Sequence, residues 1–220
     1  MTKAFFLALI TLAPVAVSAQ SRIGIFGGYS TVSTVAELGD PTGSHPRNGV
    51  SGFTPGIAAT LQLIGHLSLT AEVMTVRKGF SRTYDEPGIN ISTYDLDIRY
   101  TEIPLLLGER YPLHHGFSLQ IQGGATWSLR SQCSETVNPP DGLSSHTDCV
   151  HTSNGEVVPP NDLSLTAGFG VVWHRLWLAG NYEFTGKNIP ANSPGLGLQE
   201  RTLTLMAGFD VVLGKAPPAR

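Results

Sequence analysis

A polar segment at residues 131–161 gathers side chains that could bind a metal ion or catalyse a reaction. His146, Asp148 and His151 lie close together around Cys149. Imidazole and carboxylate groups are common metal ligands and general bases, but the same spacing is typical of a solvated loop. The sequence has no phosphate-binding glycine loop, HExxH or serine nucleophile elbow. We therefore expect no enzyme activity, no catalytic or metal-binding residue and no cofactor.

A second group of polar residues occurs inside regularly alternating segments, where side chains of one parity share a face. Charges on an inward face could line a pore or form a carboxylate pair with perturbed proton affinity. They could also pair and fill a narrow interior, because an unpaired buried charge is costly, and this plug is the expected arrangement. The predicted lumen network comprises Glu72, Glu102, Gln120, Gln122, Asn181, Glu183 and Asp210, with Gln62, Lys78, Arg99 and Arg130 as further candidates.

The elements that carry these residues are predicted to be β-strands. In residues 117–129 the odd positions are apolar except Gly123, and the even positions are small or polar. Period-two alternation is typical of a strand with one apolar and one polar face. The same pattern predicts eight strands and no helices. Their approximate ranges are 21–30, 54–64, 66–80, 94–110, 116–130, 162–173, 175–186 and 200–213.

The lengths of the strands and of their connections indicate a membrane barrel. The predicted strands run about 10 to 15 residues, and a tilted bilayer crossing needs about 9 to 11. Short connections at 65–66, 111–116 and 174–175 alternate with long ones at 31–53, 81–93, 131–161 and 187–199. Outer-membrane barrels have this layout, with tight periplasmic turns and long external loops. The predicted fold is an all-β, eight-stranded antiparallel up-and-down transmembrane barrel.

The volume of the barrel decides which face points inward. An eight-stranded barrel has a narrow interior that small and polar side chains can fill, so the Leu, Ile, Phe and Trp face should contact lipid. A soluble lipocalin-like barrel is the alternative, and it would carry charged outer faces, which residues 116–130 and 162–173 lack. The predicted lipid-facing aromatic residues are Trp127, Phe169, Trp173, Tyr182, Phe184 and Phe209.

The predicted strand at 94–110 has an inconsistent phase. Leu96, Ile98 and Tyr100 share one parity, whereas Ile103, Leu105 and Leu107 share the other. Pro104 cannot donate a ladder hydrogen bond and suggests a bulge or local irregularity. The sequence therefore leaves open whether Arg99 and Glu102 face inward or outward.

The N-terminus and the composition indicate export to a membrane. Residues 1–19 have a basic start, an apolar run and small residues before a cleavage position, as in a signal peptide. Charged residues make up 14% of the chain, well below the roughly 25% of soluble domains. We assign residues 20–214 to the barrel and 215–220 to a short periplasmic tail. The formal charge of -3 gives no reason to expect a nucleic-acid partner.

The two cysteines, Cys133 and Cys149, both lie in the predicted third loop. In an exported chain such a pair is most simply a disulfide, whose loop closure contributes roughly 3 kcal/mol. The pair lacks the CxxC spacing of redox-active sites.

The segment YTEIPLLLGERYP, residues 100–112, resembles the PorT-like family of outer-membrane barrels from Bacteroidetes. Tyr100 and the Glu-Ile-Pro-Leu-Leu run at 102–106 match the family's central strand, and the segments at 69–81 and 181–189 are similar to other strands of the family. The last strand also resembles the signal read by the barrel-assembly machinery, except that it ends on aliphatic residues. The resemblance implies an integral outer-membrane protein of undefined activity.

The sequence therefore predicts a barrel in the outer membrane of a Gram-negative bacterium, with a closed polar lumen. Its expected role is structural or surface interaction through the long loops. Lipid, the barrel-assembly machinery and a surface or envelope protein are the expected partners. A narrow pore for small or hydrophobic solutes and the soluble ligand-binding barrel remain alternatives.

Overall fold

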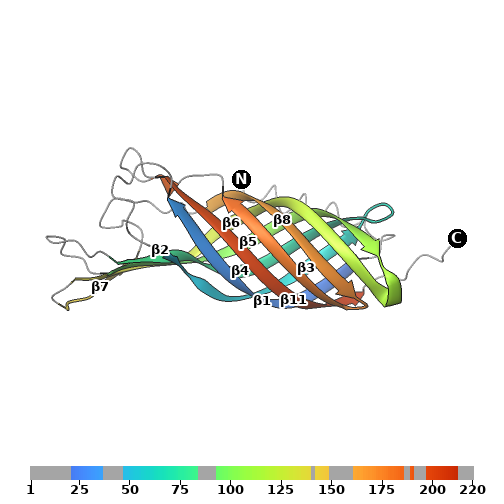
Figure 1. Ribbon diagram of the computed structural model, residues 1–220, viewed down its shortest axis with the longest axis horizontal. Coiled ribbons are helices and arrows are strands. Elements are labelled where there is room, and N and C mark those ends of the chain that lie inside the picture. The colour runs from blue at the N-terminus through green and yellow to red at the C-terminus, as the bar shows by residue number, and fades with distance from the viewer. Residues whose placement is uncertain are drawn as a thin grey trace, which may run out of the picture.

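The computed structural model describes residues 21–36, 47–83, 93–139, 142–148, 161–185, 189–190 and 197–212. Within these residues, eight long antiparallel strands close a barrel (Figure 1), which confirms the predicted fold class. The strands are β1 (Ser21–Ala36), β3 (Ser51–Gln62), β4 (Leu67–Thr83), β5 (Thr93–Pro112), β6 (Phe117–Asn138), β8 (Asn161–Trp173), β9 (Leu176–Thr185) and β11 (Gly197–Val212). The barrel closes where β1 pairs with β11. The predicted signal peptide and C-terminal tail lie outside the described residues.

Three tight connections lie at one end of the barrel, as predicted. They occupy residues 63–66, 113–116 and 174–175. His115 and His174 adopt positive φ angles of 59° and 55° there, a backbone region that the turns impose on non-glycine residues. This end of the barrel is called the turn end below, and the opposite end is called the loop end.

The strands at the loop end are longer than predicted. β1 continues to Ala36, and β6 continues to Asn138 into the segment predicted as a loop. Three short strands extend the sheet: β2 (Arg47–Gly49) pairs with β4, β7 (Ser145–Asp148) with β6, and β10 (Ile189–Pro190) with β11. The prediction that residues 131–138 and 145–148 are loop was therefore wrong.

A β-bulge explains why the alternation pattern ended too early in β6. Tyr100 of β5 pairs with Arg130, but Arg99 pairs with Gln132, which leaves Ser131 as an extra residue. The Ser131 hydroxyl donates to the Arg99 carbonyl oxygen at 3.0 Å. Because one extra residue exchanges the two faces of a strand, the odd positions of β6 turn inward beyond Ser131 and the period-two pattern loses its phase.

The irregularity predicted at Pro104 occurs on its β4 side, where the ladder lacks the pairs of Glu72 with Pro104 and of Val73 with Ile103. On the β6 side the register shift lies at Arg99 and Tyr100. Pro104 pairs regularly with Thr126 and is buried, as are Glu102 and Tyr100 on the same face of β5. Arg99 is exposed. Even-numbered residues face inward along the whole of β5. The apolar residues are odd-numbered where β5 runs through the apolar belt, and even-numbered at the loop end, where they pack inside.

Two apolar cores result. One lies inside the barrel and comprises Phe26, Ala58, Met74, Val76 and Met206, with Trp177 and Ala179 packed against it. The other lies at the loop end and comprises Phe80, Tyr94, Leu96, Ile98 and Tyr100, with Cys133 and Val137 packed against it. The second core accounts for the apolar phase of residues 94–100.

Candidate functional site

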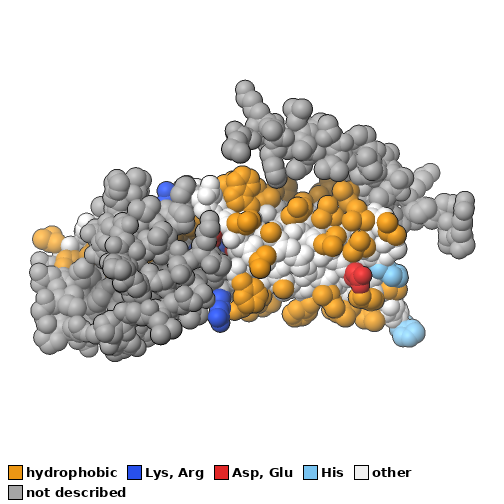
Figure 2. Space-filling view, turned by 90° about the horizontal axis from the view of Figure 1, so that it is seen from above, with side chains coloured by type: hydrophobic (Ala, Val, Ile, Leu, Met, Phe, Trp, Pro, Cys, Tyr) orange, Lys and Arg blue, Asp and Glu red, His pale blue; other side chains and the backbone are white. Residues whose placement is uncertain are grey.

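The outer wall of the barrel is apolar. Along β8 the exposed residues are Leu163, Leu165, Ala167, Phe169, Val171 and Trp173, whereas Ser164, Thr166, Gly170 and Val172 are buried. Figure 2 shows hydrophobic side chains covering the wall, with basic side chains toward the loop end and histidine and acidic side chains at the turn end. A closed barrel with such a belt satisfies its backbone internally and presents apolar surface to hydrocarbon.

Most of the predicted lipid-facing aromatic residues are exposed on this wall. Phe169 is 66% exposed and Phe184 47%, while Tyr182 and Trp127 are half-buried on the same side. Trp173 stacks on Phe117 near the turn end, with ring centroids 5.9 Å apart. Trp127, Tyr182 and Phe184 lie nearer the loop end of the wall, and Phe169 lies between the two groups. The remaining predicted residue, Phe209, is also exposed.

An ionic cluster lies in the lumen toward the loop end. The Lys78 ammonium is 2.6 Å from Glu102 and donates to Glu183 at 2.9 Å. Ser164 donates to the same oxygen of Glu183 at 2.6 Å, and Ser128 donates to Glu102 at 3.3 Å. All three charged side chains are at most 7% exposed. This pairing offsets part of the desolvation cost of burying the three charges.

An apolar layer closes the lumen on the turn side of the ionic cluster. The Phe26 ring extends toward Gly56, where an added Cβ would lie only 2.2 Å from it. The Trp177 ring extends toward Gly208 in the same way, at 2.3 Å. Small residues opposite large ones are how a small barrel fills its interior.

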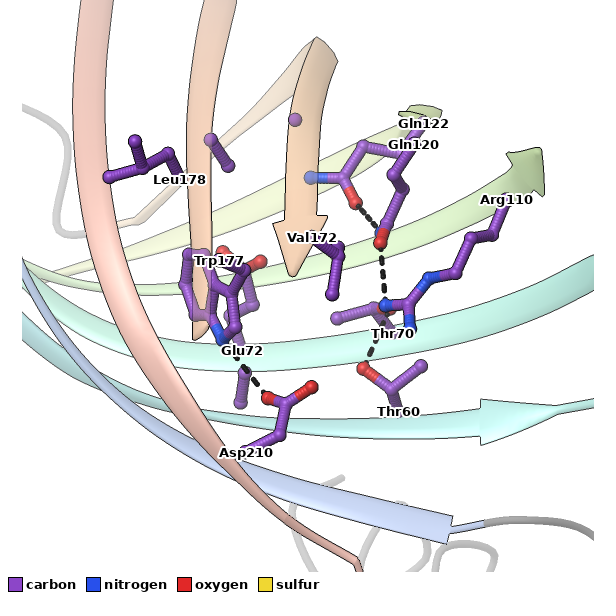
Figure 3. Close-up of a pocket in the computed structure, with 13 residues that line it drawn as sticks. Thr60, Thr70, Glu72, Arg110, Gln120, Gln122, Val172, Trp177, Leu178 and Asp210 are labelled. Atoms are coloured by element: carbon purple, nitrogen blue, oxygen red, sulfur yellow. Dashed lines mark hydrogen bonds between the residues drawn. The ribbon is translucent and has the colours of Figure 1, made fainter. Parts of the chain in front are cut away.

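A chain of amide groups lies between this layer and the turn end. Arg110 donates to Gln120 at 2.9 Å, Gln120 to Gln122 at 2.8 Å, and Gln122 to Asn181 at 3.0 Å. The Trp177 indole donates to Asp210 at 3.0 Å. Gln120, Gln122 and Asp210 line one cavity together with Glu72 (Figure 3), so this cavity gathers four of the seven predicted network residues.

The cavity has a volume of about 40 Å³, and a second space of about 240 Å³, called the vestibule below, lies beside it at the turn end. Thr60 and Arg110 line both spaces. Glu72, Gln122 and Asp210 line the deeper one. The network predicted from the sequence is thus divided. Glu102 and Glu183 lie in the ionic cluster, Glu72, Gln120, Gln122 and Asp210 line the cavity, and Asn181 accepts a hydrogen bond from Gln122.

Two arginines of the cavity region were missed by the sequence prediction. Arg110 lies on the inward parity of β5, eight residues after Glu102, and Arg22 pairs with Asp210 at 3.7 Å. Once the inward position of Glu102 is known, the period-two rule identifies Arg110. The sequence left open which face of β5 points inward, so Arg110 was not assigned to the lumen.

The candidate loop site is only partly described. His146 accepts or donates a hydrogen bond with Thr136 at 3.0 Å, within the β6 and β7 pairing. Cys133 lies opposite Ile98. Cys149 and His151 lie outside the described residues, so the disulfide stays a prediction. In the described part of the chain, no group of three or more His, Cys, Asp or Glu residues is placed to hold a metal ion.

Among the described residues, no helix is long and apolar enough to span a membrane.

Comparisons with known proteins agree on the fold. No family model and no curated protein sequence matches the chain. The structure of the outer membrane protein OprG from Pseudomonas aeruginosa is similar over 90% of this chain and 98% of that one, with a TM-score of 0.53 and 12% identity. Ail, the attachment invasion locus protein of Yersinia pestis, covers 87% of this chain and 99% of its own, at 14% identity and a TM-score of 0.43. The structure of AlkL, an outer membrane protein solved in lipid bilayers, is similar over 90% of this chain and 93% of that one, with 14% identity and a TM-score of 0.45.

At 12% identity, the similarity to OprG shows the fold alone. The apolar wall and the internal satisfaction of the backbone are properties of this chain itself. A closed eight-stranded barrel with a lipid-facing exterior belongs to the outer membrane of Gram-negative bacteria. The chain is therefore an eight-stranded outer-membrane β-barrel protein.

Proposed function

We propose that this barrel is a structural or surface-interaction protein that works through its loop end and not through catalysis. The observation that carries this proposal is the length of three adjacent strands. β5 has 20 residues and β6 has 22, whereas β9 has 10. Since about 9 to 11 residues cross a bilayer, β4 to β6 extend well past the apolar belt and project with β2 and β7 (Figure 1).

The projecting sheet has the properties of a rigid platform. Its inner face carries the loop-end apolar core, whose members are 0 to 5% exposed. On its outer side, Arg77 and Asp97 form a bidentate pair with distances of 2.7 and 2.8 Å. A preordered surface loses little conformational entropy on binding. These features support contact with a surface or envelope protein.

Photo-crosslinking in intact cells tests this role. Leu143 is 79% exposed between β6 and β7, so a photoreactive amino acid at this position should form adducts with a second envelope or surface protein. The same amino acid at Leu165, on the lipid-facing wall, is the matched control and should give no such adducts. Absence of protein adducts at Leu143 in cells that contain the folded barrel would contradict a surface-interaction role.

The pore alternative makes a different prediction. Because the apolar layer and the Lys78 cluster occupy the lumen in succession, the purified barrel should show no stable single-channel openings in planar bilayers. A preparation of detergent without protein controls for artefactual steps. Reproducible openings with one conductance value would overturn the closed lumen.

The finer assignments are part of the same proposal. Membership of the PorT-like family is supported by Tyr100, Glu102 and Pro104, which match the family's central strand and all face inward on β5. The proposed contacts during and after assembly are the barrel-assembly machinery and outer-membrane lipid. The Cys133 and Cys149 disulfide is proposed on the cysteine count alone.

A further inference from the structure

The cavity at the turn end contains a buried carboxylate that no protein group satisfies. Glu72 is 4% exposed and lines the cavity, and its Oε2 atom has no hydrogen-bond partner. Its paired neighbour on β3 is Ala58, and the nearby Thr60 on β3 and Thr70 on β4 also line the cavity; none of these side chains is charged. An unpaired buried carboxylate is costly, so this position favours a ligand that carries a positive charge or donates hydrogen bonds.

The same cavity contains an arginine that forms no ion pair with a described carboxylate. The part-buried guanidinium of Arg110 donates to the neutral oxygen of Gln120, and no described carboxylate forms an ion pair with it. The other carboxylate of the cavity, Asp210, already pairs with Arg22 and accepts from Trp177. Arg110 therefore favours an anionic group, and guanidinium binds carboxylates with strong, directional hydrogen bonds.

The shape of the space restricts what can enter. Trp177 and Ala179 line the cavity and pack against the apolar layer of the lumen, so the cavity has a closed inner end. A volume of about 40 Å³ holds roughly three water-sized groups. The vestibule between His66, Gln62 and Arg22 gives access from the turn end. Only a small solute, or the end of one, fits beside Glu72.

We propose that the turn-end cavity binds a small zwitterion that carries a primary ammonium group and a carboxylate. The ammonium group contacts Glu72, and the carboxylate contacts Arg110. A simple cation is repelled by Arg110, and a simple anion is repelled by Glu72. A ligand with both charges compensates both side chains at once. Because short turns of outer-membrane barrels face the periplasm, the site samples periplasmic solutes.

Calorimetric titration of the full-length purified barrel in detergent tests the proposal. Glycine and β-alanine are the probes, and methylammonium and acetate each carry one of the two charges. At least one zwitterion should bind saturably and at least tenfold more tightly than either single-charge compound. The substitutions Glu72→Gln and Arg110→Gln should each weaken binding by roughly tenfold or more, because each removes a hydrogen-bonded charge pair.

Matched variants control for nonspecific charge effects. Glu109→Gln and Arg77→Gln change exposed charges outside the cavity and should leave zwitterion binding unchanged. The gel mobility of unboiled samples reports whether each variant is folded. If Glu72→Gln does not fold, the comparison of zwitterions with methylammonium and acetate on the unaltered protein still tests whether both charges of the ligand are needed. Equal binding of all four probes, no binding, or unchanged affinity in a folded Glu72→Gln variant would overturn the proposal.

Discussion

Replacing Lys78 with methionine is expected to lower the free energy of unfolding by about 3 to 5 kcal/mol. The Lys78 ammonium is the only described cation that contacts Glu102 and Glu183, and these side chains are 0% and 7% exposed. Without it, two buried carboxylates face each other across the lumen with only hydroxyl donors left. Denaturant titration of the barrel in detergent, followed by unboiled gel mobility, measures the loss.

Two comparison variants separate charge from packing. Arg77→Met, at the neighbouring position of β4, removes an exposed charge that pairs with the partly exposed Asp97. It should lower the free energy of unfolding by less than about 1 kcal/mol. The triple variant Lys78→Met, Glu102→Gln and Glu183→Gln removes all three charges and should recover much of the stability, because buried ion clusters can be replaced by neutral groups. A Lys78→Met barrel as stable as the parent would show that the cluster does not hold the lumen closed.

Replacing Leu165 with arginine is expected to destabilise the folded barrel in a bilayer by about 2 to 4 kcal/mol. Leu165 is 68% exposed in β8, between Ala125 of β6 and Phe184 of β9. This position lies on the apolar wall, where an arginine must either enter hydrocarbon or distort the lipid to reach water. The loss of unfolding free energy in liposomes measures the effect.

The matched control is Leu143→Arg, at an exposed position outside the apolar wall. It should change stability by less than about 0.5 kcal/mol, as surface substitutions usually do. Equal stabilities of the Leu165→Arg and Leu143→Arg barrels would mean that the β8 wall does not contact lipid. The soluble-barrel alternative would then need to be reconsidered.

The sequence by itself determined the strand content, the facing of most strands and the arrangement of turns at one end. Each of these depends on local patterns. Within β8, the odd-numbered Phe169 is exposed and the even-numbered Thr166 is buried. The connection from β8 to β9 is only two residues long, which makes it a tight turn. Period-two alternation is a property of consecutive residues, so no long-range information was needed. For the strands with one consistent phase, the lumen-facing and lipid-facing sets follow from it once the narrow interior excludes large apolar side chains.

Only the tertiary structure decided which polar residues meet. Lys78 contacts Glu183, which lies 105 residues further along the chain, and this contact depends on barrel closure and on the register of every strand between them. The bulge at Ser131 exchanged the faces of β6, and the apolar core at the loop end decided that the apolar residues of 94–100 point inward. The polar residues divide between the ionic cluster around Lys78 and the cavity that contains Glu72 and Arg110. This division depends on the height of each residue along the barrel axis. Alternation fixes the face of a residue, whereas its height and its partners across the lumen are set by strand register, which no local pattern encodes.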